Sequence, residues 1–281
     1  MVYPEKEFLL EIANVSEIIY KYKKKYPTFT KISILNDTNL CSSDLFLANF
    51  FKNNIKNSTF LYYISNTLDL QGLIYLSLKQ KKIYIVFRGS ESKYDWFYNL
   101  HIKKINLFDN VYVHSGYYKL LMIDNTFNII KQIIIELSEI YINYEICLTG
   151  HSCGSGLATL STFLISRELP NYKFSNYTFG SPRIGNYDFV DTFESSNCKC
   201  FTIINNSDMV ARIPSLGYYN MKNLIFIDEK NKKIQFKTIK PIKNWLYNSV
   251  ENLLDLLYNF SFYDHKMSNY ITNIKRFYQS S

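Results

Sequence analysis

The stretch Thr-Gly-His-Ser-Cys-Gly at residues 149–154 constrains this chain more than any other part of its sequence. It contains the pattern Gly-x-Ser-x-Gly with Ser152 at its centre, between an apolar run at 146–148 and a helix-like run at 155–169. A strand, a glycine-flanked turn and a helix in this order expose a serine hydroxyl, because the glycines let strand and helix approach without Cβ clashes. We therefore interpret Ser152 as a nucleophile, in preference to a structural hydroxyl in a Gly-Ser turn.

Strands and helices alternate through the middle of the chain. Apolar β-rich runs predict strands at 60–64, 72–78, 82–87, 111–113, 146–148, 173–179, 200–204, 224–227 and 233–238. Helical spacing of apolar residues predicts helices at 5–24, 42–54, 117–140 and 246–257, and a short helix near the C-terminus. This alternation indicates an α/β fold with a mainly parallel sheet and helices on both faces. We expect residues 1–281 to form a single domain, with 1–59 as an N-terminal helical extension packed on it.

The chain is basic. Lysine and arginine together number 32, against 24 aspartates and glutamates, which gives a net charge of +8. Such a surface is attracted to anionic lipid headgroups or to nucleic acid. No nucleic-acid motif accompanies the charge, so we expect no nucleic-acid partner.

The cysteines and the apolar runs bear on the cellular compartment. The five cysteines are Cys41, Cys147, Cys153, Cys198 and Cys200, an odd number whose spacing fits no zinc site. They predict packed, reduced thiols and no metal. The first 25 residues lack the apolar core of a signal peptide, and no run reaches the roughly 20 apolar residues of a membrane span. We expect a soluble protein that is cytoplasmic or peripheral to membranes.

A serine hydroxyl becomes a nucleophile only when a neighbouring base accepts its proton. In the α/β-hydrolase arrangement the acid and then the histidine follow the serine along the chain. The chain has four histidines, and only His265 lies beyond Ser152. Counting alone therefore makes His265 the predicted base, in preference to a surface loop histidine.

The acid is less constrained than the base. The candidate aspartates beyond the serine are Asp188, Asp191, Asp208, Asp228, Asp255 and Asp264. The acid should lie in a loop just past the carboxyl end of a strand. Asp208 fits because it follows the strand at 200–204 and a polar turn, and Asp228, which also ends a strand, is the second candidate.

An oxyanion hole requires two donors aimed at the developing negative charge. We expect the first to be the backbone N–H of Cys153, the residue after the nucleophile. The second should come from the loop after the strand at 82–87, where Ser90 follows Gly89 and offers both its N–H and its hydroxyl.

Several short motifs, in the same order, resemble those of the class 3 lipases, the fungal-lipase-like branch of the α/β-hydrolases. They lie at 85–90 with Trp96, 113–117, 149–154, 177–186, 206–210 with Pro214, and 264–265 with Tyr270. The resemblance spans about residues 60–280. The chain differs from the family at Cys153, where leucine is usual, and at 155–156, where Gly-Ala is usual.

This resemblance implies an α/β-hydrolase fold and a role for each site residue. Ser152 is implied as nucleophile, His265 as base, and Asp208, in preference to Asp228, as acid. The implied oxyanion donors are Ser90 and Cys153. The resemblance also implies a lid in the apolar segment 91–110, for which a helix buried in the core is the alternative interpretation.

Together these residues predict a hydrolase of lipid carboxylic esters that works like a triacylglycerol lipase. It would form an acyl-enzyme on Ser152 and need neither a metal nor an organic cofactor. A phospholipase, a short-chain esterase or a catalytically silent lipid-binding module of the same fold are the alternatives. The expected partners are a lipid or ester substrate and, transiently, a membrane or lipid-droplet surface.

Overall fold

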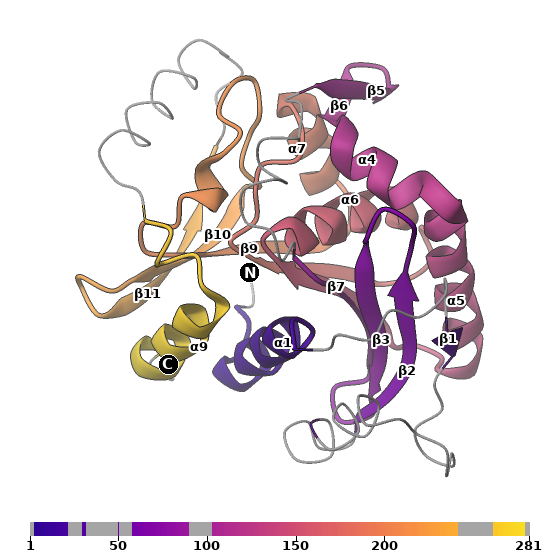
Figure 1. Ribbon diagram of the computed structural model, residues 1–281, viewed down its shortest axis with the longest axis horizontal. Helices are drawn as coiled ribbons and strands as arrows, with labels where there is room; N and C mark the ends of the chain where they lie inside the picture. The colour runs from indigo at the N-terminus through magenta and orange to yellow at the C-terminus, as the bar shows by residue number, and fades with distance from the viewer. Residues whose placement is uncertain are drawn as a thin grey trace.

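The structure is a computed structural model that describes residues 3–21, 30–31, 50, 58–89, 103–240 and 261–278. A central sheet dominates it (Figure 1). In their order across the sheet, the strands of the described part are β1 (Thr30–Lys31), β2 (Ser58–Ser65), β3 (Gln71–Ser77), β4 (Lys82–Phe87), β7 (Glu145–His151), β8 (Phe174–Phe179), β9 (Lys199–Asn205), β10 (Asn223–Asp228) and β11 (Lys233–Thr238).

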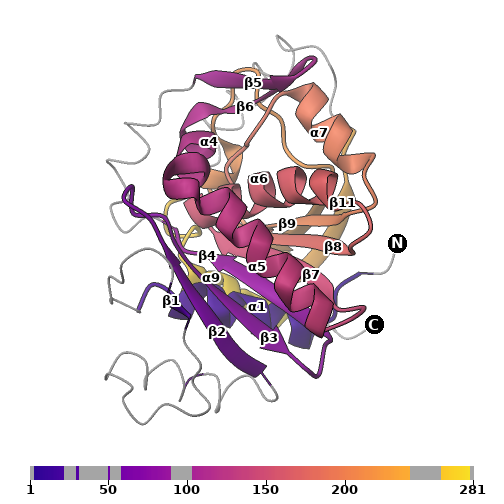
Figure 2. The same ribbon diagram turned by 90° about the vertical axis from the view of Figure 1, so that its right-hand side faces the viewer.

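Helices cover both faces of this sheet. Those that the structure describes are α1 (Lys6–Ile18), α4 (Ser115–Met122), α5 (Thr126–Ile140), α6 (Cys153–Glu168), α7 (Tyr187–Glu194) and α9 (Met267–Phe277), with short 3-10 turns η1 (Ile123–Asn125) and η2 (Val210–Arg212). Figures 1 and 2 show α4 to α7 on one face and α1 with α9 on the other. The layered arrangement is the one that alternating strands and helices predict.

The middle of the sheet is parallel. Strands β4, β7, β8, β9 and β10 run in the same direction, whereas β2, β3 and β11 pair antiparallel towards the edges. The register pairs Phe87 with Gly150, Gly150 with Thr178, and Phe179 with Ile203. The carboxyl ends of the parallel strands therefore meet at one edge, which is where sites of open α/β sheets form. The predicted mainly parallel sheet is confirmed.

Successive side chains of a central strand enter two different cores. Along β4, Ile83, Ile85 and Phe87 pack on the side of α4 to α7, while Tyr84 and Val86 pack on the side of α1 and α9. All five are fully buried. A strand covered on both faces needs apolar residues at every position, which explains the unbroken apolar runs in the sequence.

The two terminal helices share one core. Leu9 and Ile12 of α1, and Ile274 of α9, have no exposed surface. The Phe8 ring also packs edge-on against Tyr177 of β8, with centroids 4.8 Å apart. Helix α1 ends at Ile18, earlier than the predicted 5–24, and its last turns lie against the sheet beside α9.

The helix predicted at 117–140 is divided by a kink. Asp124 and Asn125 adopt left-handed backbone conformations, with φ of 53° and 58°. The side chain of Asp124 accepts the Thr67 N–H at 2.7 Å, and Asn66 donates to the Leu120 carbonyl at 2.8 Å. These contacts with the β2–β3 turn hold η1 between α4 and α5. The apolar period continues across the break, which is why the sequence pattern conceals it.

The segment 91–110 is described only in its last part. Residues 91–102 lie outside the described residues, as do the predicted helix at 246–257 and, apart from Phe50, the one at 42–54. Residues 104–108 form strand β5, which pairs antiparallel with β6 (Val111–His114) in a separate two-stranded sheet. A helix buried in the core is therefore the wrong interpretation for 104–108, because adjacent β6 offers this stretch a ladder partner.

Glu11 is a partly buried carboxyl on the face of α1 that meets the sheet. Gln80 donates to its Oε2 at 2.8 Å, and the Tyr75 hydroxyl lies 3.5 Å from its Oε1. Burial raises the pKa of Glu11 from 4.5 to about 7, against the lowering influence of Lys79 and of the Tyr75 hydrogen bond. The folded state therefore binds this proton more tightly than the unfolded state does.

We expect the free energy of unfolding to fall as pH rises from about 4.5 to about 7, because the raised pKa favours the folded state only while Glu11 is protonated. The Glu11→Gln side chain is neutral at every pH. At alkaline pH the free energy of unfolding of this variant should therefore be about 1–3 kcal/mol higher than that of wild type. Urea denaturation at pH 5 and pH 8 measures this. The control is Glu7→Gln, whose side chain is 86% exposed, and an equal effect there would contradict the prediction.

Candidate active site

Ser152 lies on the turn between β7 and α6. Its backbone has φ 58° and ψ −128°, a conformation that residues other than glycine rarely adopt and that functional sites often hold. Its N–H donates to the Phe179 carbonyl of β8 at 3.0 Å, and its carbonyl accepts the Ser155 N–H at 3.0 Å. The turn is therefore fixed both by the neighbouring strand and by the first turn of the helix.

The two glycines of the motif allow a close approach of three backbone segments. A Cβ at Gly154 would collide with the carbonyl of Phe87 at the end of β4. A Cβ at Gly150 would lie 2.6 Å from the Gly154 carbonyl carbon and 2.7 Å from the Phe87 oxygen. Backbone atoms of Phe87 and Gly154 therefore leave no room for a side chain at either position, which is why both need glycine.

Asp208 lies in the loop after β9 and has no exposed surface. Its Oδ1 and Oδ2 are 3.0 Å and 2.9 Å from Nδ1 of His265. The Tyr270 hydroxyl donates to Oδ2 at 2.5 Å, and the Val210 N–H donates to Oδ1 at 2.8 Å. Because a carboxylate only accepts, Nδ1 of His265 carries the proton and Nε2 is left as the basic nitrogen.

The charge of Asp208 is maintained although the carboxyl is buried. Burial by itself raises its pKa, but the charge and hydrogen bond of His265 and the hydrogen bond of Tyr270 together hold the pKa below its usual value. A carboxylate paired in this way orients a histidine ring and stabilises its protonated form.

Backbone and side-chain hydrogen bonds join the acid loop to the histidine loop. Asp264 Oδ2 accepts from Asn206 Nδ2 at 3.1 Å and from the Ser207 N–H at 3.2 Å. The Ser261 N–H donates to the Ser207 carbonyl at 2.7 Å. Asp264, which precedes the histidine, therefore holds the two loops together and is not the acid that orients the ring.

Gly180, just past β8, leaves room for the pair. Its φ is +55°, and a Cβ there would lie 2.6 Å from Asp208 Oδ2 and 2.9 Å from His265 Nδ1. Any side chain at this position would push the carboxylate and the imidazole apart. The glycine in the motif at 177–186 thus has a direct steric reason.

His151 connects the serine turn to the histidine loop. Its ring stacks on that of His265 with centroids 4.5 Å apart, and its Nε2 is 2.7 Å from the His265 carbonyl oxygen. Sequence reasoning missed this role, as it missed the contact of Tyr20 with the same ring. Nothing in the local sequence signals either, since the partners are more than a hundred residues apart.

Of the two predicted oxyanion donors, Cys153 lies within the described residues and Ser90 does not. Cys153 is the first residue of α6 and is 4% exposed. Its N–H therefore belongs to the first turn, whose N–H groups have no partner within the helix. Ser90 lies outside the described residues, which include Gly89 before it. A role of both as donors stays a prediction.

The other acid candidates have separate structural roles or positions. Asp228 sits at the β10–β11 turn, where its carboxylate accepts from Asn231 and Gln235. Asp191 pairs with Lys222 at 2.8 Å. Asp188 lies in the first turn of α7, and Asp255 lies outside the described residues. Among the described aspartates, Asp208 alone contacts the His265 ring.

The family model for lipase (class 3) matches residues 84–218, which include the serine turn and the acid loop. Over these residues the chain is similar to the class 3 lipases. His265 lies beyond the matched residues, and its place beside Asp208 comes from the structure.

Relatives with curated descriptions include plant and fungal enzymes. Phospholipase A1-Igamma1, chloroplastic, from Arabidopsis thaliana is 24% identical over 265 residues, which is 82% of this chain and 48% of that protein. The lipase of Rhizopus niveus is 25% identical over 203 residues, 70% of this chain and 51% of that protein. The chain spans about half the length of the curated relatives it matches.

Solved structures of fungal lipases share the fold. Lipase II from Rhizopus niveus superposes with a TM-score of 0.72 at 20% identity, over 92% of each chain. The lipase from Rhizopus microsporus var. chinensis gives a TM-score of 0.70 at 20% identity, over 94% of this chain and 87% of that one. The predicted α/β-hydrolase fold is confirmed.

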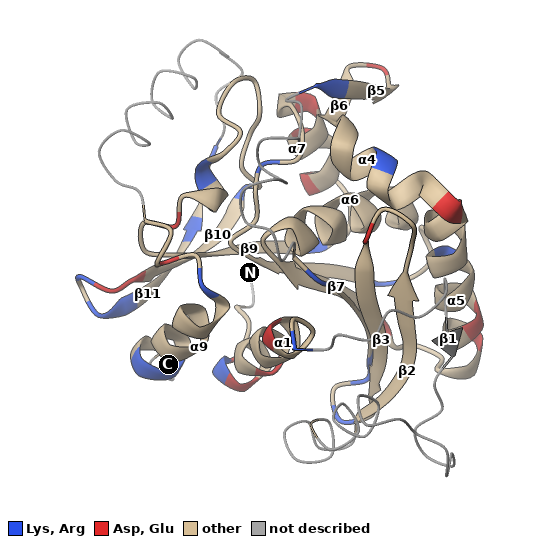
Figure 3. Ribbon diagram, in the orientation of Figure 1, with Lys and Arg blue, Asp and Glu red and all other residues tan. Residues whose placement is uncertain are grey.

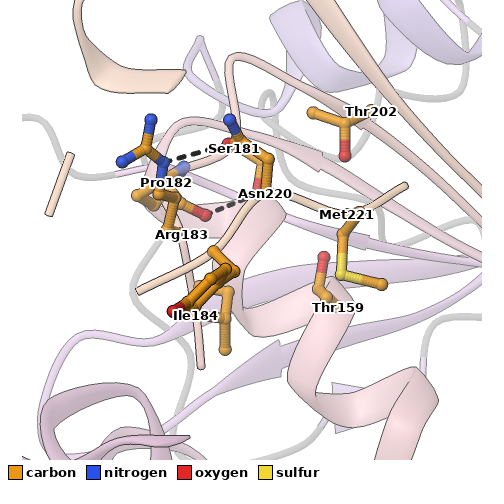
Figure 4. Close-up of a pocket in the computed structure, with 9 residues that line it drawn as sticks. Thr159, Ser181, Pro182, Arg183, Ile184, Thr202, Asn220 and Met221 are labelled. Atoms are coloured by element: carbon orange, nitrogen blue, oxygen red, sulfur yellow. Dashed lines mark hydrogen bonds between the residues drawn. The ribbon is translucent and has the colours of Figure 1, made fainter. Parts of the chain in front are cut away.

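A small pocket is lined by residues of α6, of the segment after β8 and of the segment before β10. Figure 4 shows its lining, in which Arg183 Nε donates to Asn220 at 3.2 Å and Thr159 of α6 faces Met221. Its enclosed space is about 10 Å³, about enough for one water molecule, so it is too small to hold an acyl chain. In the described part of the chain, no helix is long and apolar enough to cross a bilayer.

Gly154→Ala should destabilise the fold by about 2–4 kcal/mol, because the added methyl group meets the Phe87 carbonyl. The sign is diagnostic, since Gly→Ala in an unobstructed helix stabilises by about 1 kcal/mol. Thermal and urea denaturation measure the change. Ser166→Ala, in the same helix, is the control and should stay within about 0.5 kcal/mol of wild type. A stabilised Gly154→Ala protein would refute the close approach.

Proposed function

We propose that this chain is a serine hydrolase of lipid carboxylic esters, similar in action to a triacylglycerol lipase, with Ser152 as nucleophile, Asp208 as acid and His265 as base. One observation carries the proposal. A buried carboxylate binds Nδ1 of the single histidine that follows a serine on a strained strand-to-helix turn. This is the set of roles that activates a serine.

In the proposed reaction, Nε2 of His265 takes the Ser152 proton while the serine oxygen attacks the ester carbonyl. The Cys153 N–H and the Ser90 donors hold the oxyanion, and the alcohol leaves with the proton from His265 to give an acyl-enzyme. Water activated by His265 then releases the fatty acid and restores Ser152. The lowered pKa of Asp208 keeps its carboxylate charged, so it stabilises the imidazolium at each step. The steps use only protein groups and water.

The substrate class rests on the relatives. Those from Rhizopus niveus and Rhizomucor miehei are named lipases, and the Arabidopsis thaliana relative is named a phospholipase A1. All of these names refer to lipid esters. We therefore propose a lipid ester as the substrate of this chain, with an acylglycerol as its first candidate.

Ser152→Ala should lower turnover of p-nitrophenyl esters by at least about a thousandfold, because the variant lacks the hydroxyl that forms the acyl-enzyme. A fluorophosphonate should label wild type at Ser152 and should not label the variant. Ser166→Ala, in the same helix but beyond the turn, should hydrolyse and be labelled like wild type. Equal turnover by wild type and Ser152→Ala would refute the proposal and favour a catalytically silent lipid-binding module.

The same assay distinguishes among esters. Turnover that rises with acyl length and with emulsified triacylglycerol indicates a lipase. Preference for phosphatidylcholine vesicles indicates a phospholipase, and turnover of short soluble esters alone indicates an esterase.

We also propose that the protein makes transient contact with a membrane or lipid-droplet surface through the histidine loop. Phe262 and Tyr263, which precede His265 in this loop, are 48% and 65% exposed. Lys266 lies over the Tyr263 ring, 5.2 Å from its centroid. Exposed aromatic rings next to a lysine are typical of surfaces that touch lipid headgroups.

The remaining basic charge is spread over several sides of the molecule, including the β10–β11 turn and the end of α9 (Figure 3). We propose that it adds a general attraction to anionic lipid, and that the segment 91–110 acts as a lid over the site. A single-domain organisation and a cytoplasmic or membrane-peripheral location stay predictions.

Replacing Phe262 and Tyr263 together by serine should weaken binding to phosphatidylglycerol vesicles at least about tenfold, because two aromatic side chains leave the lipid interface. Turnover of a soluble short-chain ester should stay within about twofold of wild type, since neither ring contacts the reacting atoms. Sedimentation with vesicles measures the binding. The matched control is Ile140 and Ile142 to serine, which are 69% and 71% exposed at the opposite end of β7. Equal loss in both variants would contradict the proposed surface.

A further inference from the structure

Tyr20, which follows the end of α1, reaches the back of the serine turn. Its N–H donates to the Glu17 carbonyl at 3.1 Å, which continues the helical turn and directs the ring towards the sheet edge. Its hydroxyl oxygen is 2.8 Å from Nδ1 of His151, and the two rings meet edge to face. A residue of the N-terminal helix thus contacts the neighbour of the proposed nucleophile.

The directions of the hydrogen bonds follow from their partners. The carbonyl oxygen of His265 can only accept, so Nε2 of His151, 2.7 Å away, must carry a proton. In neutral imidazole the other nitrogen is then an acceptor, so the Tyr20 hydroxyl donates to Nδ1. Burial raises the pKa of Tyr20 far above its ordinary value, which keeps this hydroxyl protonated.

The same hydroxyl also binds the loop that leads to Ser90. The backbone N–H of Gly89 donates to the Tyr20 oxygen. A side chain at Gly89 would collide with that oxygen, so the contact depends on the glycine. The hydrogen bonds therefore run in one direction, from Gly89 to Tyr20, from Tyr20 to His151, and from His151 to the carbonyl of His265.

We propose that Tyr20 is a positioning residue for the ester hydrolysis proposed above, on which this inference rests. It holds His151 in the neutral tautomer protonated at Nε2, and through that ring it holds His265 and the loop after β4 in place. These hydrogen bonds, which all donate in the same direction, join the loop that carries His265, the turn at Ser152 and the loop after β4. The three segments come from distant parts of the sequence.

Charge gives a second reason for a neutral His151. His265 becomes an imidazolium in the proposed reaction, and the His151 ring is stacked on it at 4.5 Å. Groups that also face His151 include Tyr270, with ring centroids 6.0 Å apart, and the Asp208 carboxylate, whose charge acts on it. A proton on Nδ1 would displace the Tyr20 donor and place two like charges face to face. The Tyr20 hydroxyl disfavours that state.

Tyr20→Phe removes only the hydroxyl and tests the proposal. We expect kcat for a soluble ester to fall about five- to tenfold with KM within about twofold, as for the loss of one positioning hydrogen bond. The acid limb of kcat/KM should move to higher pH, because His151 then accepts a second proton more readily. The control is Tyr75→Phe, which removes another hydroxyl that contacts α1, at Glu11, away from the site. It should match wild type in kcat and in the acid limb.

A measurement independent of turnover separates this inference from the proposed function. In protein labelled with ¹⁵N-histidine, His151 should show the Nε2–H tautomer in wild type and titrate at higher pH in Tyr20→Phe. An active wild type with unchanged rate, acid limb and tautomer in Tyr20→Phe would overturn the role of Tyr20 and leave the ester hydrolysis standing. A wild type that is inactive would refute the proposed function, and the tautomer would still decide whether Tyr20 sets the state of His151.

Discussion

The close approach of three backbone segments beneath Ser152 is the constraint on which the rest of the site depends. The Phe87 carbonyl of β4 occupies the space where Gly154 would carry a side chain, and Gly150 faces Gly154 across the turn. Ser152, with φ 58° and ψ −128°, makes the sharp turn between β7 and α6 at this contact. Because β4, β7 and the first turn of α6 are fixed together, the loop after β4 and the helix N-terminus must face the same space. This packing is the physical reason for expecting the loop after β4 and the N-terminus of α6 to supply the two proposed oxyanion donors.

A second constraint is electrostatic. The carboxyl of Asp208 is fully buried, and a buried charge without partners is costly. Its partners come from three segments: Val210 at the start of η2, His265 in the loop before α9, and Tyr270 within α9. Two of these partners, His265 and Tyr270, reach Asp208 only when α9 packs on the sheet. The buried charge of Asp208 and the packing of α9 therefore depend on each other.

Local pattern predicted much of this structure. Short apolar runs rich in β-forming residues predicted β2 to β4 and β7 to β11. The glycine-flanked serine predicted the turn between β7 and α6. Counting histidines indicated His265, whereas the preference for Asp208 over Asp228 needed the family resemblance, because each follows a strand. The break between α4 and α5 was missed because it depends on Asn66 and Asp124, whose partners lie outside the helix. The contact of Tyr20 with His151 was missed for the same reason, because its two partners are 131 residues apart in the sequence.

The two cores of the molecule give its site two different neighbourhoods. Tyr270, Phe179 and α1 belong to the core that holds the acid, the base and the proposed Tyr20 link. Cys153 belongs to the opposite core, together with Tyr117 and Ile184, which a side chain at Gly156 would meet. The chain departs from the usual family residues at Cys153 and at 155–156, on this second side. Substitutions there alter the packing around α6 without touching the hydrogen bonds of Asp208 and His265. The departures from the family pattern and the hydrogen bonds of Asp208 and His265 therefore lie on opposite faces of one sheet.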